Sequence, residues 1–113
     1  MRRISKKQEE KIAEIIGGKV VPGSGSTDFK KGDVENKYSL IECKTLAKPR
    51  LSHTIKKNDL EKIQQQAFEA GKEIAVLAFD FGDSKNYFIL DEKTFLNVMQ
   101  VYFTKICDEG ELN

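Results

Sequence analysis

An aspartate, a glutamate and a lysine stand at a spacing that suits chemistry on a phosphate ester. Asp33 is followed nine residues later by Glu42-Cys43-Lys44. Asp and Glu carboxylates are typical ligands of hard cations such as Mg²⁺. A lysine beside them can orient a water molecule or stabilise the charge that develops on the phosphate. Asp33, Glu42 and Lys44 are therefore candidate catalytic residues, with the two carboxylates as candidate metal ligands.

The local pattern explains how these groups could meet. Residues 38–45 read as a β-strand, in which alternate side chains share a face. Leu40, Glu42 and Lys44 then lie on one face, which is apolar at its start and charged at its end. The backbone carbonyl of Cys43 lies between the two charged residues and is a further candidate metal ligand.

Two positions of the acid set have competitors nearby. A helix expected before residue 17 carries Glu9, Glu10 and Glu14, any of which could complete an acidic site or simply face solvent. Glu9 is favoured because it is roughly in line with the apolar stripe of that helix. Asp28 competes with Asp33 for the metal, but Asp33 is favoured because it heads a short strand beside the Glu42 strand.

Several residues around the acids have the chemistry of nucleic-acid contacts. Ser24 and Ser26 lie in a glycine-rich loop whose hydroxyl and N–H groups could contact phosphate, although an ordinary turn is the alternative. The basic candidates are Lys30, Lys31, Lys48, Arg50 and His53, the last being the only histidine. Residues 64–66 are three glutamines, which are expected on the polar face of a helix.

The elements that must position these groups can be read from periodicity and turn signals. Ser5 is the expected N-cap of a first helix, with Gln8 three residues later, and Gly17-Gly18 ends it. A second helix is expected from an Asn58 cap to Gly71. A final helix follows an Asp91 cap, with an apolar stripe expected to pack in the core or in a dimer interface, and the tail from residue 108 is expected to fray. Strands are expected at residues 19–21, 33–35, 38–45, 73–81 and 86–90, the last two as a hairpin.

This order predicts an α/β fold: a single domain spanning residues 1–113, with a mixed central β-sheet flanked by helices in the order α-β-β-β-α-β-β-α. The net charge is only +1, but residues 1–57 hold 14 Lys/Arg against 7 Asp/Glu, which predicts one basic face and a polyanionic partner. Cys43 and Cys107 lack metal-ligand spacing and are expected as reduced thiols of a cytoplasmic protein. No apolar run has the length of a membrane span, so no membrane partner is expected.

With Glu9, Ser24-Gly25-Ser26, Asp33 and Glu42-Cys43-Lys44 in this order, the chain resembles small Holliday junction resolvases of the PD-(D/E)xK superfamily, both phage-encoded and archaeal. The resemblance spans roughly residues 4–104. It implies a restriction-endonuclease-like fold and a Mg²⁺- or Mn²⁺-dependent DNA endonuclease of recombination and repair. It also implies a homodimer, since symmetric cutting of a junction suits a two-fold pair.

The same resemblance assigns roles to residues: Glu9 as the helix acid, Asp33 and Glu42 as metal ligands, Lys44 as the catalytic lysine, and Ser24 near the scissile phosphate. The dipeptide at the first acid is Gly32-Asp33 rather than Pro-Asp. The chain also lacks the extra segments with which larger resolvases grip a junction. A general nicking or repair endonuclease, a catalytically inactive DNA-binding module and a small protein-interaction domain are the alternatives.

Overall fold

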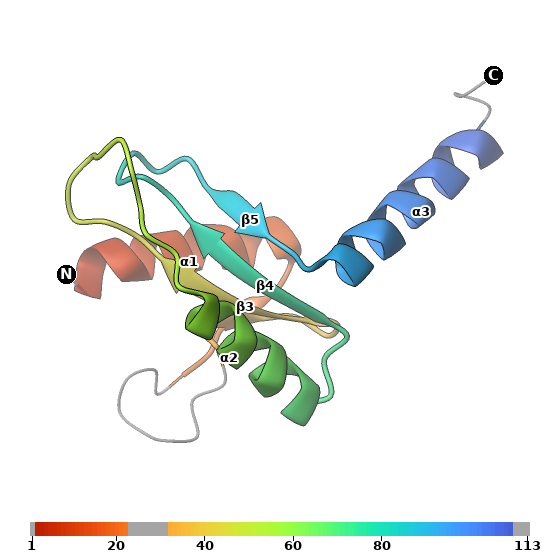
Figure 1. Cartoon of the computed structure of the whole chain (residues 1–113), viewed down its shortest axis with the longest axis horizontal. Coiled ribbons are helices and arrows are strands. Elements are labelled where there is room, and N and C mark those ends of the chain that lie inside the picture. The colour runs from red at the N-terminus through yellow and green to blue at the C-terminus, as the bar shows by residue number, and fades with distance from the viewer. Residues whose placement is uncertain (1, 23–31, 110–113) are drawn as a thin grey trace.

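The computed structural model describes residues 2–22 and 32–109, and in the first turn of the first helix only the backbone. Its elements run in the expected order (Figure 1): α1 (Arg2–Ile16), β1 (Lys19–Val20), β2 (Val34–Glu35), β3 (Ser39–Lys44), α2 (Lys57–Glu69), β4 (Ile74–Phe79), β5 (Tyr87–Ile89) and α3 (Glu92–Asp108).

The five strands form one mixed sheet in the order β1-β2-β3-β4-β5, which confirms the predicted α/β class. Strands β3 and β4 are parallel, with Ser39 paired to Ile74 and Lys44 paired to Phe79. The other neighbours are antiparallel, including the β4–β5 hairpin. Because β3 and β4 are parallel, the segments that follow Lys44 and Phe79 leave the sheet at the same end, the carboxyl end of these strands.

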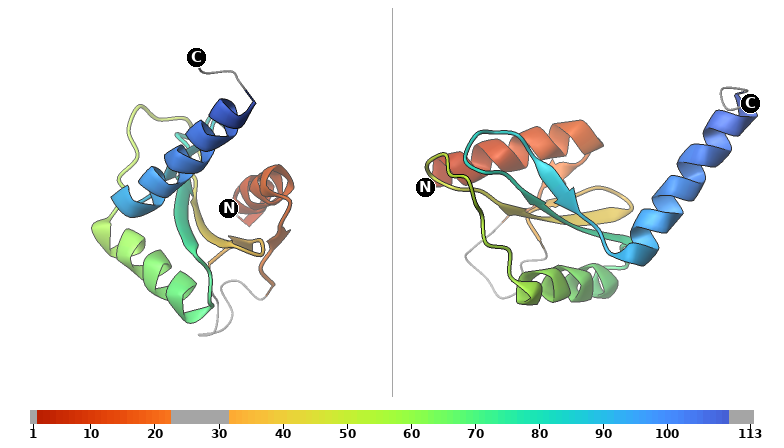
Figure 2. Two further views of the ribbon diagram at one scale, coloured as in Figure 1. Left: turned by 90° about the vertical axis from the view of Figure 1, so that its right-hand side faces the viewer. Right: turned by 45° about the horizontal axis from the view of Figure 1, so that its top comes forward.

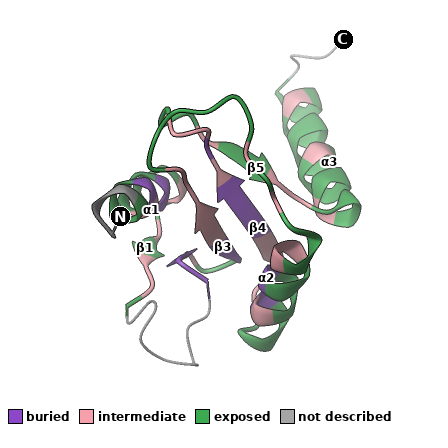
Figure 3. Cartoon of the chain, turned by 60° about the vertical axis from the view of Figure 1, so that its left-hand side comes forward, coloured by how far each residue is buried: buried purple, intermediate pink, exposed green. Residues whose placement is uncertain are grey.

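Helices α1 and α2 cover opposite faces of this sheet (Figure 2). On the α1 face, Ile12 and Ala13 pack with Ile41, Val76 and Ala78. On the α2 face, Leu40 packs with Ile63 and Ala67. The buried residues are concentrated in β3, β4 and the helix sides that face them (Figure 3). Strand β3 is thus covered on both sides, which is why consecutive Leu40 and Ile41, which face opposite sides, are both apolar.

The predicted starts of the first two helices are wrong. Helix α1 begins at Arg2, so Ser5 lies inside it, and the Gln8 side chain donates to the carbonyl of Lys44 instead of returning to a cap. Helix α2 begins at Lys57, and extended Lys56 is its N-cap without a side-chain bond, so Asn58 is already helical. In both helices, residues before the expected cap are already helical, so the helix begins earlier in the chain.

Two large apolar residues of these helices are exposed. Ile15 of α1 lies three residues after buried Ile12 but is 62 % exposed, and Phe68 of α2 follows buried Ala67 but is 80 % exposed.

Helix α3 departs most from expectation, since core packing does not account for its apolar stripe. The helix projects away from the sheet (Figure 1), and none of its described residues is buried. Its exposed apolar side chains are Phe95, Leu96, Val98, Val101, Tyr102 and Phe103. The helix continues through Asp108, where the sequence predicts the start of a frayed tail. Residues 110–113 lie outside the described part.

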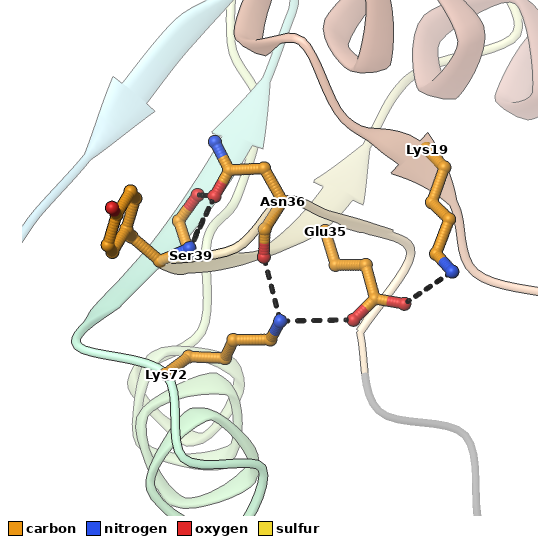
Figure 4. A network of polar contacts seen from close by, with 6 residues as sticks. Lys19, Glu35, Asn36, Ser39 and Lys72 are labelled. Atoms are coloured by element: carbon orange, nitrogen blue, oxygen red, sulfur yellow. Dashed lines mark hydrogen bonds and ion pairs between the residues drawn. The ribbon is translucent and has the colours of Figure 1, made fainter.

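A polar network fixes the end of the sheet remote from the carboxyl end of β3 (Figure 4). Lys72 Nζ donates to the Asn36 carbonyl at 2.7 Å and lies 3.3 Å from Glu35 Oε1. Glu35 also lies 4.0 Å from Lys19. The Asn36 side chain accepts from the Ser39 N–H and hydroxyl. The network therefore ties β1, β2 and the turn before β3 to the segment between α2 and β4.

Cys43, half-buried in β3, and Cys107, exposed on α3, are not joined in a disulfide. None of the helices in the described part of the chain is long and apolar enough to cross a membrane.

Asp91 caps α3 as predicted, and this makes the helix sensitive to acid. Its side chain accepts from the N–H of Thr94 at 2.8 Å, and hydrogen bonds from the Thr94 side chain and backbone hold the pKa of Asp91 below its usual value. Since the folded pKa is lowered, the cap contributes fully above the pKa of a free aspartate and is lost as pH falls through the lowered value. Asp91→Ala should weaken α3 by about 1 kcal/mol at neutral pH.

Amide hydrogen exchange of residues 95–105 measures this effect. Asp91→Asn is the matched variant, because asparagine caps well but does not titrate in this range. Equal acid sensitivity of α3 in the native chain and in Asp91→Asn would rule out the Asp91 carboxylate as its source.

Candidate active site

Asp33 lies beside β3 and is hydrogen-bonded to it through both its backbone N–H and its side chain. Val34 pairs with Ile41, so Asp33 stands one residue before this pair and Glu42 one residue after it. The Asp33 N–H donates to the Ile41 carbonyl, and Asp33 Oδ2 accepts from the Cys43 N–H, both at 2.8 Å. The residue is 3 % exposed. The structure therefore brings the first acid of the predicted site to the backbone between Glu42 and Lys44.

The glycine before this acid has a steric reason. Gly32 is buried with φ +73°, a region that L side chains avoid and that proline cannot adopt. A Cβ at this position would stand 2.8 Å from Leu40 Cγ, so the core also lacks room for one. The departure from Pro-Asp thus follows from the backbone that carries Asp33 against β3.

Glu42 and Lys44 share a face of β3, as strand alternation predicted. Lys44 Nζ lies 3.6 Å from Glu42 Oε2 and 3.9 Å from Asp59 Oδ2 of α2. Leu40, on the same side of the strand, packs against α2. The sequence pattern did not predict Asp59 as a neighbour of Lys44. Its only signal in the sequence is its place near the start of a helix, where acids are common because they complement the helix dipole.

The oxygen donors at this point suit Mg²⁺ or Mn²⁺. In a strand the N–H and C=O of one residue point to the same edge. Since the Cys43 N–H faces Asp33, the Cys43 carbonyl points to that edge too. Within residues 2–22 and 32–109 no three side chains of His, Cys, Asp or Glu group as a metal site. The oxygen atoms at this strand end include those of the Asp33 and Glu42 carboxylates and of the Cys43 carbonyl.

Helix α1 covers the face of β3 opposite to Glu42 and Lys44. On this helix Glu9 is half-buried, whereas Glu10 and Glu14 are exposed. Gln8 contacts the strand end directly, since its Nε2 donates to the Lys44 carbonyl at 3.1 Å and to Asn86 Oδ1 at 3.0 Å. The capping-box pattern predicts only a local partner for Gln8, so this contact was not predicted from the sequence.

The remaining predicted contacts divide into three groups. Lys48 and Arg50 are exposed in the connection between β3 and α2. His53 in the same connection is half-buried, with Nδ1 2.7 Å from the Asp80 carbonyl and its ring edge-on to Phe79, so it helps to hold this connection on the sheet. The last group lies outside the described residues: Ser24, Ser26, Asp28, Lys30 and Lys31.

The three consecutive glutamines of α2 differ in their surroundings. Gln64 donates to Asp91, the N-cap of α3, and Gln65 donates to Glu69 one turn later in α2. Gln66 is half-buried, and its Oε1 has no hydrogen-bond partner among the described residues.

The bond between Asp33 and Cys43 predicts a stability effect that is separate from any activity. Asp33→Ala should lower the free energy of unfolding by about 1–3 kcal/mol, because the half-buried Cys43 N–H loses the carboxylate that accepts its hydrogen bond. Asp33→Asn retains an acceptor oxygen and should lose less. Urea unfolding of both variants, with exposed Asp108→Ala as control, measures the difference. An Asp33→Ala chain as stable as the control would mean that this bond does not hold the site.

No protein-family model, no curated protein and no solved structure matches this chain.

Proposed function

We propose that the chain is a Mg²⁺- or Mn²⁺-dependent DNA endonuclease that hydrolyses phosphodiesters of branched DNA, most specifically a Holliday junction resolvase of the PD-(D/E)xK type. The observation that carries the proposal is the bond from the Cys43 N–H to Asp33, which gathers two carboxylates, a carbonyl and a lysine at one strand end. A protein that only binds DNA would lose affinity by placing carboxylates beside a phosphate, because the two negative charges repel each other.

Each of these residues has a distinct role in the proposed reaction. The Asp33 and Glu42 carboxylates and the Cys43 carbonyl would hold the ion, which supplies Lewis-acid activation of the phosphate and of water. Lys44 would orient the attacking water or stabilise the charge developing on the phosphate. Glu42 and Asp59 both lie within ion-pair distance of the Lys44 ammonium and would hold it at this strand end.

Basic side chains near this strand end support a DNA substrate. Lys7 and Lys11 of α1 lie against the segment that follows β3. That segment leads to exposed Lys48 and Arg50, and it lies at the same end of the molecule as the start of α1 (Figure 2). Cations on two separate elements that flank the acids could contact the phosphates on either side of a scissile bond.

The exposed face of α3 supports a homodimer. Phe95, Met99, Tyr102 and Ile106 recur at spacings of four and three, which forms an apolar stripe along the helix. A contiguous exposed patch of this kind usually marks an interaction site. Antiparallel pairing of two α3 helices about a two-fold axis would also place Lys93 of one copy near Asp108 of the other. Such a dimer would present two sites to a symmetric junction.

Cleavage of a labelled four-way junction beside a matched linear duplex tests the activity. The native chain should nick the junction in symmetric pairs with Mg²⁺ and should be inactive in EDTA. Glu42→Gln removes a metal ligand and Lys44→Met removes the positive group, and each should lower the rate by about 10²–10³. Glu61→Gln on α2 is the control, because that exposed acid lies outside the cluster and its loss should leave the rate unchanged.

The other outcomes identify the alternatives. Equal cutting of junction and duplex would make the protein a general nicking nuclease. Salt-sensitive junction binding without cutting under any metal condition would make it a DNA-binding module. Cutting that survives both Glu42→Gln and Lys44→Met would place the active site elsewhere.

The dimer has its own test by sedimentation equilibrium. The native chain should show twice its 12.8 kDa mass. Tyr102→Glu should weaken association at least about a hundredfold, because both copies lose the burial of a large side chain worth about 1.5–3 kcal/mol each. Gln100→Glu adds the same charge to the same helix outside the stripe and should leave the dimer intact. A native monomer at high concentration would refute this interface.

A further inference from the structure

A row of paired residues joins the proposed site to aromatic side chains on the same face of the sheet. Lys44 of β3 pairs with Phe79 of β4, and Phe79 pairs with Tyr87 of β5. Residues paired in this way carry their side chains on one face, and this is the face that α2 covers. Helix α2 packs on Leu40 and Ala75, near the starts of β3 and β4. The row therefore lies at the other end of that face, where these two strands leave the sheet.

The aromatic rings at this end form one cluster, with Phe79 at its centre and Tyr87 as its most exposed member. The Phe79 ring lies edge-on to Phe81 and His53, with centroids 5.5 and 5.8 Å away, and 5.7 Å from the ring of Tyr87. Phe81 also lies edge-on to Tyr87. Tyr87 nevertheless remains 50 % exposed, whereas the other three residues are half-buried. The cluster thus holds one large aromatic ring in place at the surface.

The connection between β3 and α2 brings cationic residues to the same cluster. The Arg50 N–H donates to the Phe81 carbonyl at 2.9 Å. The Lys48 carbonyl packs so closely on Gly82 that a Cβ at this glycine would clash with it. Both Arg50 and Lys48 are exposed, and their connection lies beside the turn before β5 at the end of the molecule where α1 begins (Figure 1). Cations from two segments, Lys44 of β3 and this connection, therefore border the aromatic rings.

Exposed aromatic rings beside cations suit a single strand of nucleic acid. Every base has a face that can stack on an aromatic ring, while cations contact the phosphates of the backbone. A base inside a duplex is already stacked on its neighbours, so only an unpaired or opened base can offer that face.

The distance between Tyr87 and the proposed site fits a continuous strand. Neighbouring strands of a sheet lie about 4.8 Å apart, so the backbones of Lys44 and Tyr87 are separated by two such steps, or about 10 Å. Stacked nucleotides advance about 3.4 Å each along a DNA strand. A phosphate at Lys44 and a base at Tyr87 would therefore belong to nucleotides no more than about three positions apart.

We propose that the exposed ring of Tyr87 is a stacking platform for one unpaired DNA base, a few nucleotides from the phosphate that the Lys44 site would cleave. The inference rests on the proposed DNA-directed function and deepens it, because it assigns the recognition of bases opened at a branch point to a particular surface. A protein partner is the other possible occupant of an exposed aromatic surface. The cations that border the rings favour a polyanion instead.

The test is fluorine NMR of the native chain labelled with fluorotyrosine, in EDTA so that no cleavage is needed. The three tyrosines, Tyr38, Tyr87 and Tyr102, are all about half exposed, and single Tyr→Phe variants assign their signals. A pentanucleotide of deoxyadenosine should shift the Tyr87 signal. Tyr38 lies just before β3 at the other end of the sheet and Tyr102 lies on α3, so their signals should stay in place as internal controls.

Two further DNA probes separate stacking from attraction to phosphate. An abasic pentamer has the same backbone charge but no bases, so it should bind about tenfold more weakly than the adenine strand and leave the Tyr87 signal in place. A long duplex should bind through its phosphates without the Tyr87 shift, because its bases remain stacked on one another.

Neighbouring residues of β5 supply matched variants. Tyr87→Leu keeps an apolar side chain without the ring and should weaken binding of the adenine strand about tenfold, whereas Tyr87→Phe should retain the affinity. Phe88→Leu removes a similarly exposed ring from the opposite face of the same strand and should leave the affinity unchanged.

Four results would overturn the proposal: a Tyr87 signal that the adenine strand does not move, a duplex that moves it as far as the single strand does, equal affinity for the adenine and abasic strands, or equal losses from Tyr87→Leu and Phe88→Leu. None of these depends on nuclease activity. A chain that cuts junctions but fails this test refutes the platform alone, whereas a chain that binds as described but never cuts refutes the nuclease proposal alone.

Discussion

The pleat of β3 is the constraint on which the rest of the molecule depends. Its alternating side chains face two different helices: Ile41 packs toward α1 and Leu40 toward α2. Its two edges are bonded to β2 and β4. The strand therefore cannot slip by one residue without exchanging both cores at once. Once this register is set, Glu42 and Lys44 must emerge on the α2 face at the strand end, and the Cys43 N–H must face Asp33.

The two ends of the sheet differ in what their polar groups do. At the end where β3 begins, Lys72, Glu35 and Asn36 satisfy one another across elements and close the structure (Figure 4). At the end where β3 leaves the sheet, two acids meet one lysine, since Glu42 and Asp59 both lie close to Lys44. In open sheets with parallel strands, ligands typically bind beyond the carboxyl ends of the strands, which is the end where the proposed site lies.

The sequence predicted those features that depend on residues close together in the chain. Element order, the shared face of Glu42 and Lys44, and the Asp91 cap follow from short-range periodicity and were correct. Contacts between distant residues gave no such signal: Gln8 meets Lys44 across 36 positions, and Asp59 joins Lys44 only once α2 is docked. Helix α3 shows another limit of sequence-based prediction. An apolar stripe has the same spacing whether it packs against the same chain or against a second one. Ser5 and Asn58 failed as caps because neighbouring residues could also adopt helical conformation.

Lys44 takes part in both faces of the sheet at once. Its ammonium lies beside Glu42 and Asp59, while its carbonyl accepts from Gln8 on the α1 side. A ligand on either face that displaces the Lys44 peptide would therefore also move the group that Lys44 presents on the other face. Thermodynamic linkage makes such an effect reciprocal: if occupancy of one face changes affinity at the other by some factor, the reverse change has the same factor. In the proposed nuclease, Lys44 would therefore couple occupancy of the α1 face to ion affinity on the α2 face.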